Sequence, residues 1–87
     1  MKNLERVLKA LANKRRLEIL KALKGGRDKE LSVGEISERI NLSFKATSRH
    51  LSILISADIL GKEQRGLQVF YRIVMSNRWF KDIVTAL

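Results

Sequence analysis

Residues 32–54, SVGEISERINLSFKATSRHLSIL, decide the fold of this chain. Ser32 and Glu35 have the three-residue spacing of a capping box, so a helix is expected over residues 33–40. An asparagine follows, and asparagine tolerates the left-handed conformation that ends helices. A second helix, capped by a serine, is expected over residues 43–56. Two short helices joined by such a tight turn predict a helix-turn-helix unit.

Downstream of this unit the apolar pattern changes its period. Residues 60–65 and 68–74 are typical of two short strands around Gly66 and Leu67. A helix-turn-helix followed by a hairpin is the winged-helix arrangement, in which the hairpin flanks the second, recognition helix. Ser76 can cap a last helix with a broad apolar face.

Upstream, a stripe of apolar residues at helical spacing predicts a first helix: Leu4, Val7, Leu8 and Leu11. Asn13 can cap a second helix that ends at Gly25 and Gly26, and residues 27–30 are expected to form a solvated loop. The expected fold is therefore mainly α with a small β-hairpin, a winged helix-turn-helix of order α-α-α-α-β-β-α. Residues 1–87 are expected to form a single domain.

The composition of the chain limits the classes of partner that it is expected to bind. Eighteen basic residues against nine acidic ones give a net charge of +9, which favours nucleic acid or an anionic membrane surface. The alternative is a surface made basic for solubility. The chain has no cysteine and one histidine, so disulfides, thiolate sites and cysteine nucleophiles are excluded. It contains neither a transmembrane stretch nor a signal peptide, so we expect a cytoplasmic protein without a membrane partner.

Three segments together resemble the ArsR/SmtB (arsenic-repressor) family of transcription regulators. They are LKALANKRRLEILKAL (8–23), ELSVGEISERINLSFKATSRHLSIL (30–54) and ADILGKEQRGLQVFYRI (57–73). Within the second, SRHL (48–51) matches the signature of the family. The resemblance implies a homodimer whose terminal helices pack together and whose two winged helix-turn-helix units bind operator DNA.

The sequence departs from the metal-sensing members of this family. Their cysteines are replaced here by Ser32, Gly34 and Ser37. The zinc site that other members build on the last helix would have no histidine and only Asp82 as an acid. We therefore expect no metal and no cofactor, and any effector would be an unidentified small molecule or protein. Thr47 also stands where the family usually has an apolar residue.

The residues expected to contact double-stranded DNA lie on the recognition helix, the wing and the second helix. Arg49 is the best candidate to read a base, because its planar fork can pair with two acceptors of guanine. A phosphate contact is the alternative for Arg49, and solvated charge is the alternative for the basic side chains of the other two elements. The full set is Ser43, Lys45, Ala46, Ser48, Arg49 and Ser52 on the helix, Lys62, Arg65 and Gln68 on the wing, and Lys14 and Arg15 on the second helix.

Three further residues lie near this face, and they are His50, Phe44 and Arg16. His50 is expected to pack and hydrogen-bond beneath the recognition helix, because a metal site needs three or four donors. Phe44 is expected to fold onto its own domain. Arg16 belongs to the basic cluster of residues 14–16, for which contact with a DNA phosphate is one interpretation; the alternative is solvated charge, with Arg16 paired with a carboxylate.

The apolar faces of the first and last helices exceed what one small core needs, and we expect them to form the dimer surface. Core packing is the alternative for roughly half of these residues. They are Leu4, Val7, Leu8, Leu11, Trp79, Phe80, Ile83, Val84 and Leu87.

The sequence thus predicts a dimeric, sequence-specific DNA-binding regulator, most simply a repressor. The alternative is a winged-helix module that binds proteins and not DNA. An enzyme is not expected, because the chain has no phosphate-binding glycine loop and no acid–base constellation around its lone histidine.

Overall fold

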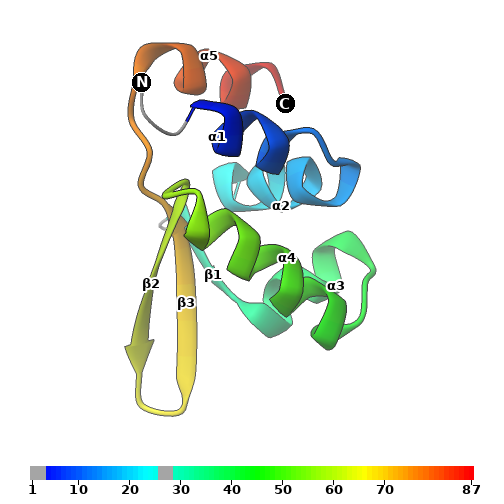
Figure 1. Ribbon diagram of the computed structural model, residues 1–87. Coiled ribbons are helices and arrows are strands. Elements are labelled where there is room, and N and C mark those ends of the chain that lie inside the picture. Colours follow the sequence, from blue (N-terminus) through cyan, green and yellow to red (C-terminus); the bar gives the residue numbers. More distant parts are fainter. Residues whose placement is uncertain (1–3, 26–28) are drawn as a thin grey trace.

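The structure is a computed structural model that describes residues 4–25 and 29–87 (Figure 1). Helices dominate it, and a hairpin projects from them, so the expected mainly α winged helix-turn-helix fold is confirmed. The elements are α1 (Leu4–Leu11), α2 (Lys14–Gly25), β1 (Glu30–Ser32), α3 (Val33–Ile40), α4 (Phe44–Ser56), β2 (Leu60–Arg65), β3 (Gln68–Ile73) and α5 (Arg78–Ala86).

Local hydrogen bonds fix the two helices of the helix-turn-helix unit as the sequence predicts. The Ser32 hydroxyl accepts from the Glu35 amide at 3.2 Å, and the Glu35 carboxylate accepts from the Ser32 amide at 2.9 Å. Asn41 closes α3 at a φ of 53°, in the left-handed region. The Ser43 hydroxyl accepts from the Ala46 amide at 3.1 Å and so caps α4. Each bond satisfies a helix-terminal group that would otherwise lack a partner.

The sheet has a third strand that the sequence analysis did not predict. The strand order is β1-β3-β2 and both pairings are antiparallel. Tyr71 of β3 lies between Leu31 of β1 and Lys62 of β2. The expectation of a loop over residues 27–30 is therefore wrong for Glu30, while residues 27 and 28 lie outside the described part. This extra strand ties the hairpin to the helix-turn-helix unit.

α5 begins one residue later than the serine cap predicts. The Asn77 side-chain oxygen accepts from the Phe80 amide at 3.1 Å, so Asn77 and not Ser76 caps the helix. This start turns Phe80 into the core, where its side chain is fully buried. The core residues around it come from every helix and from the ends of the sheet: Val7, Ile19, Leu20, Leu23, Leu31, Ile36, Leu51, Leu54, Ile59 and Leu60.

The two ends of the molecule differ in the elements that form them. Figure 1 shows α1, α2 and α5 at one end, the β2–β3 turn at the opposite end, and α3 and α4 between them. The turn is made by Gly66 at a φ of +62° and Leu67, and glycine is the residue that adopts this conformation without strain. No helix in residues 4–25 and 29–87 is long and apolar enough to cross a membrane.

Thr47 is a defect in this otherwise apolar core, and its replacement is expected to raise stability. Its side chain is 0% exposed, and its hydroxyl has no hydrogen-bond partner among the described residues. Thr47→Val keeps the shape and removes the unpaired hydroxyl, so the free energy of unfolding should rise by about 1 kcal/mol. Urea denaturation measures this, with Thr85→Val on the exposed face of α5 as the control. A loss of stability in Thr47→Val would mean that the hydroxyl has a partner.

Candidate nucleic-acid interface

The outer face of α4 carries a row of exposed polar side chains. The residues on the opposite face are fully buried at helical spacing: Thr47, Leu51 and Leu54. Because of that register, Lys45, Arg49 and Ser52 project away from the core, and all three are exposed. Ala46 and Ser48 lie on the flanks of the row and are half-buried. We call Lys45, Arg49 and Ser52 the α4 row.

The charged members of the α4 row have no partner in the part of the chain that the structure describes. Within the described residues, neither Lys45 nor Arg49 makes a side-chain hydrogen bond or an ion pair. Their charges are therefore available to an external group. Phe44, next to Lys45, is 62% exposed, so the expectation that it folds onto its own domain is wrong. It adds an apolar surface at the start of the row.

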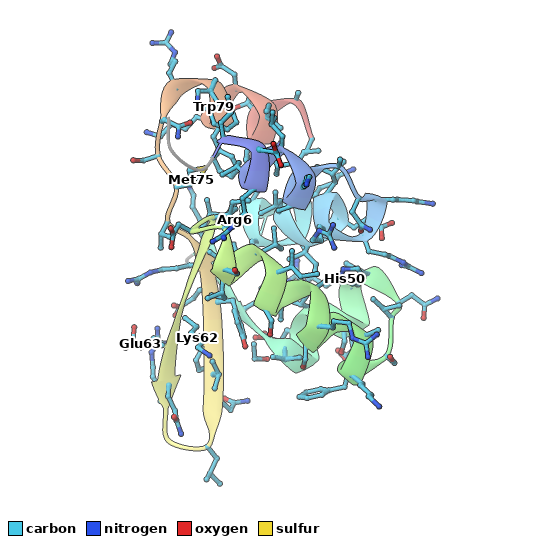
Figure 2. The ribbon with its side chains drawn as sticks, viewed as in Figure 1. Arg6, His50, Lys62, Glu63, Met75 and Trp79 are labelled. Atoms are coloured by element: carbon cyan, nitrogen blue, oxygen red, sulfur yellow. The ribbon has the colours of Figure 1, made fainter. Side chains whose placement is uncertain are left out.

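The hairpin contributes less free charge than the sequence suggests. Arg65 pairs with Glu30 at 2.6 Å and with Glu63 at 3.3 Å, and its guanidinium lies 4.7 Å from the centre of the Phe70 ring. The expectation that Arg65 reaches DNA from the wing tip therefore competes with three contacts inside the sheet. Figure 2 shows Lys62 on the hairpin, and it is exposed, as is Gln68.

Arg15 and Arg16, at the start of α2, donate hydrogen bonds to carbonyls at the C-terminal ends of α3 and α1. The Arg15 guanidinium donates to the Ile40 carbonyl at 2.6 Å and pairs with Glu18. Arg16 donates to the carbonyls of Ala10 and Lys9, at 2.6 and 3.3 Å. A cation at a helix C-terminus donates hydrogen bonds to the last carbonyls and interacts favourably with the negative end of the helix dipole. The expected carboxylate partner belongs to Arg15 and not to Arg16, and Lys14 alone is exposed.

Substitutions at Arg15 and Lys14 should therefore have different effects. Arg15→Ala removes the donor to the Ile40 carbonyl at the end of α3, and we expect the free energy of unfolding to fall by about 1–2 kcal/mol. Lys14→Ala should leave stability within about 0.5 kcal/mol, because its side chain is exposed. Thermal denaturation of both variants distinguishes them. Equal stability would show that the Arg15 contact contributes nothing to the fold.

His50 lies beneath the outer face of α4, against α2 (Figure 2). Its Nδ1 is 3.2 Å from Nη1 of Arg16, which can only donate, so Nδ1 is the acceptor and Nε2 carries the proton. Burial lowers the pKa of His50 below its usual value, and the nearby guanidinium groups, that of Arg16 foremost, lower it further. The ring is thus neutral near pH 7, as a packing and hydrogen-bonding role requires.

This lowered pKa predicts a pH-dependent stability. The folded state binds fewer protons at His50 than the unfolded state, so stability should fall as the pH drops below about 6.5, the ordinary value of histidine. His50→Gln retains an acceptor for Arg16 and removes the titration. Urea denaturation from about pH 7.5 to 5 should therefore give a flatter stability profile for the variant. Parallel profiles would contradict the lowered pKa.

The apolar surface at the other end of the molecule is smaller than the sequence suggests. Val7, Leu11 and Phe80 are buried in the core of the single chain, so assigning them to a dimer surface is corrected. They fill the interior because α1 and α5 both pack on α2. Leu4 and Leu8 are exposed, and four partly exposed residues adjoin the core: Trp79, Ile83, Val84 and Leu87. We call Leu4, Leu8, Trp79 and Ile83 the terminal patch.

No metal centre is evident in the described part of the chain. Within residues 4–25 and 29–87, no three histidine, cysteine, aspartate or glutamate side chains lie close enough together to hold an ion.

Comparison with known proteins gives concordant results. Residues 13–62 match the family described as "Bacterial regulatory protein, arsR family". The transcriptional activator HlyU of Vibrio cholerae is 45% identical over 67 residues, which are 77% of this chain and 59% of that protein. The transcriptional repressor SdpR of Bacillus subtilis is 34% identical over 67 residues, 77% of this chain and 71% of that protein. The matched part of this chain thus spans less than two thirds of HlyU.

Solved structures agree with these relatives. HlyU from Vibrio cholerae superimposes with a TM-score of 0.80 and 38% identity, over 98% of this chain and 87% of that one. A homodimeric winged helix-turn-helix DNA-binding domain from Mycobacterium bovis gives a TM-score of 0.79 and 30% identity, over 98% and 71%. The likeness extends over nearly the whole chain and includes the hairpin.

Proposed function

Because this chain belongs to the arsR family of bacterial regulatory proteins, we propose that it regulates transcription by binding duplex DNA through α4 and the β2–β3 hairpin. The α4 row carries this proposal. Lys45 and Arg49 are exposed, unpaired within the described residues and next to a projecting hairpin. A helix of this kind fits the major groove, where Arg49 can pair with guanine.

The remaining contacts follow from the positions of the exposed cations. Lys14 and Lys62 are suited to phosphates on either side of α4, and the Ser43 hydroxyl, although it caps the helix, can still donate. Arg65 enters the interface only by exchanging its carboxylate partners for phosphate. Arg15 and Arg16 then stabilise the packing of α1, α2 and α3 and do not contact DNA.

We propose further that the protein acts as a homodimer through the terminal patch. Its leucines are exposed and lie at the end of the molecule opposite the hairpin turn, where a two-fold partner leaves both α4 rows free. The homodimeric relative from Mycobacterium bovis supports the dimeric state, and the terminal patch as its surface is our proposal. Repression is the simplest outcome, because occupancy of an operator is enough for it, although the relatives include an activator and a repressor.

Selection of bound fragments from a random duplex pool tests this function. A dimer with two α4 rows should enrich an imperfect inverted repeat, with half-site centres about 10–10.5 base pairs or a multiple apart. Enrichment of a direct repeat or of a single half-site would overturn the dimeric arrangement. Failure to enrich any sequence would favour the protein-binding alternative.

A further inference from the structure

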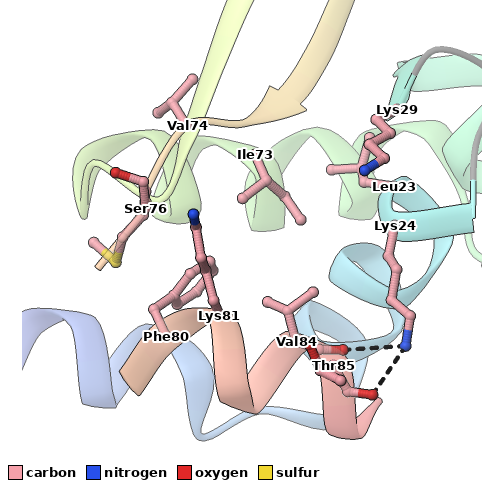
Figure 3. Close-up of a pocket in the computed structure, with 11 residues that line it drawn as sticks. Leu23, Lys24, Lys29, Ile73, Val74, Ser76, Phe80, Lys81, Val84 and Thr85 are labelled. Carbon is pink, nitrogen blue, oxygen red and sulfur yellow. Dashed lines mark hydrogen bonds between the residues drawn. The ribbon is translucent and has the colours of Figure 1, made fainter. Parts of the chain in front are cut away.

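A cavity of about 470 Å³ lies between the end of β3, α2 and α5, away from the α4 row (Figure 3). Its volume is in the range of small-molecule sites. Its wall is apolar: Leu23, Ile73, Val74, Met75, Phe80 and Val84. The polar residues that line it are Lys24, Lys29, Lys81, Ser76 and Thr85, and none of the lining residues that the structure describes is acidic.

The lysines approach the cavity from different elements. Lys81 extends from α5 toward Ile73 and Ser76, whereas Lys24 reaches across from α2 (Figure 3). Lys24 Nζ donates to the carbonyls of Val84 and Thr85, each at 3.2 Å. An ammonium has three donors, so one remains for another acceptor. Neither Lys24 nor Lys81 has an ion-pair partner among the described residues.

We propose that this cavity binds an organic monocarboxylate with an apolar body. The carboxylate would be held by Lys81 beside the Ser76 hydroxyl, and the apolar body would lie against Phe80, Ile73 and Val84. Charge complementarity selects an anion, and the apolar wall excludes a small hydrophilic one such as free phosphate. The site is distinct from the α4 row and from the terminal patch.

The location gives such a ligand a route to regulation. On α5, Lys81 and Val84 line the cavity, whereas Trp79 and Ile83 project from the other flank into the terminal patch. The cavity also touches Ile73 and Val74, where β3 leaves the hairpin. The bound ligand would therefore contact both α5, which carries two residues of the terminal patch, and the base of the hairpin. This effector role rests on the proposed function, whereas the binding itself does not.

Binding is tested without DNA, with decanoate as the probe and calorimetry as the measurement. Decanoate should bind once per chain with a dissociation constant on the order of 0.1 mM, and decylamine and decanol should bind at least about tenfold more weakly. Lys81→Gln should weaken decanoate binding about tenfold, because it removes one charge-assisted hydrogen bond. Lys21→Gln, an exposed lysine on α2 outside this cavity, is the matched control and should bind as the parent protein does.

Two safeguards keep the result interpretable. Lys24→Gln also removes the bonds to the α5 carbonyls, so Lys81→Gln, with an exposed side chain, is the deciding variant. In spectra of the methionine methyl groups, decanoate should shift the Met75 signal. Equal binding of decanoate and decylamine, equal affinity of Lys81→Gln and Lys21→Gln, or an unshifted Met75 signal would each overturn the proposal. The proposed DNA-binding function would remain intact in all three cases.

Discussion

Leu8→Glu should convert the protein from a dimer into a folded monomer. Leu8 is 49% exposed in the single chain, so its replacement leaves the core intact. In a two-fold dimer the new carboxylate would appear twice, and burying it against an apolar surface would cost much of its hydration energy. We expect the dimer dissociation constant to rise at least about 100-fold, the equivalent of about 2.7 kcal/mol. Sedimentation velocity measures the association, and circular dichroism verifies the fold.

The matched control for this variant lies at the other end of the molecule. Leu67 is 103% exposed at the hairpin turn, so Leu67→Glu introduces the same charge away from the terminal patch. It should sediment as the parent protein does. If Leu8→Glu also stays dimeric, the subunits associate through another surface, and the half-site spacing expected above no longer follows.

Arg49→Ala should abolish most of the preference for operator DNA. Each half-site would lose a bidentate base contact, at a cost of about 1–3 kcal/mol, and a dimer loses two of them. The exposed arginine has no partner in the described part of its own chain, so the fold should be unaffected. Titration of operator and random duplexes separates the two roles of Arg49. If Arg49 reads a base, the variant should lose affinity mainly for the operator. If Arg49 contacts a phosphate, the variant should lose affinity equally for the operator and the random duplex.

Arg78→Ala is the control for Arg49→Ala, since it removes the same charge from α5. Arg78 is exposed on α5, at the end of the molecule opposite the hairpin turn, and its side chain lies 4.0 Å from the Asp82 carboxylate. The affinity of the Arg78→Ala variant for operator DNA should change little. Equal losses in Arg49→Ala and Arg78→Ala would mean that only the total charge matters, and would contradict base reading by α4.

Much of this fold can be predicted from sequence because its signals are local. The capping box at Ser32 and Glu35, the left-handed Asn41 and the cap at Ser43 each depend on residues within one helical turn. The register of α4 then follows from its buried stripe, and with it the exposure of Arg49. Strand β1 was missed because three residues are too few to display an alternating pattern, and its pairing partner lies about forty residues away in the chain.

The roles of individual arginines could not be predicted for a related reason. Arg15 and Arg16 bind carbonyls of α3 and α1, and a sequence does not reveal which helix ends come together in space. Arg65 is paired with Glu30 only because β1 joins the sheet. Likewise, an apolar stripe on α1 does not distinguish core from dimer surface. That division depends on how deeply α1 sits on α2, which buries Val7 and leaves Leu8 exposed.

The salt dependence of duplex binding tests the central claim most directly. We expect Lys14, Lys45 and Lys62 each to contact a phosphate, which makes six such contacts in the proposed dimer. The logarithm of the association constant should therefore fall with the logarithm of salt concentration with a slope of about −5. Lys45→Gln with Lys62→Gln removes four of these contacts and should reduce the slope to about −2. A slope near zero, or the same slope in both proteins, would contradict binding through α4 and the hairpin.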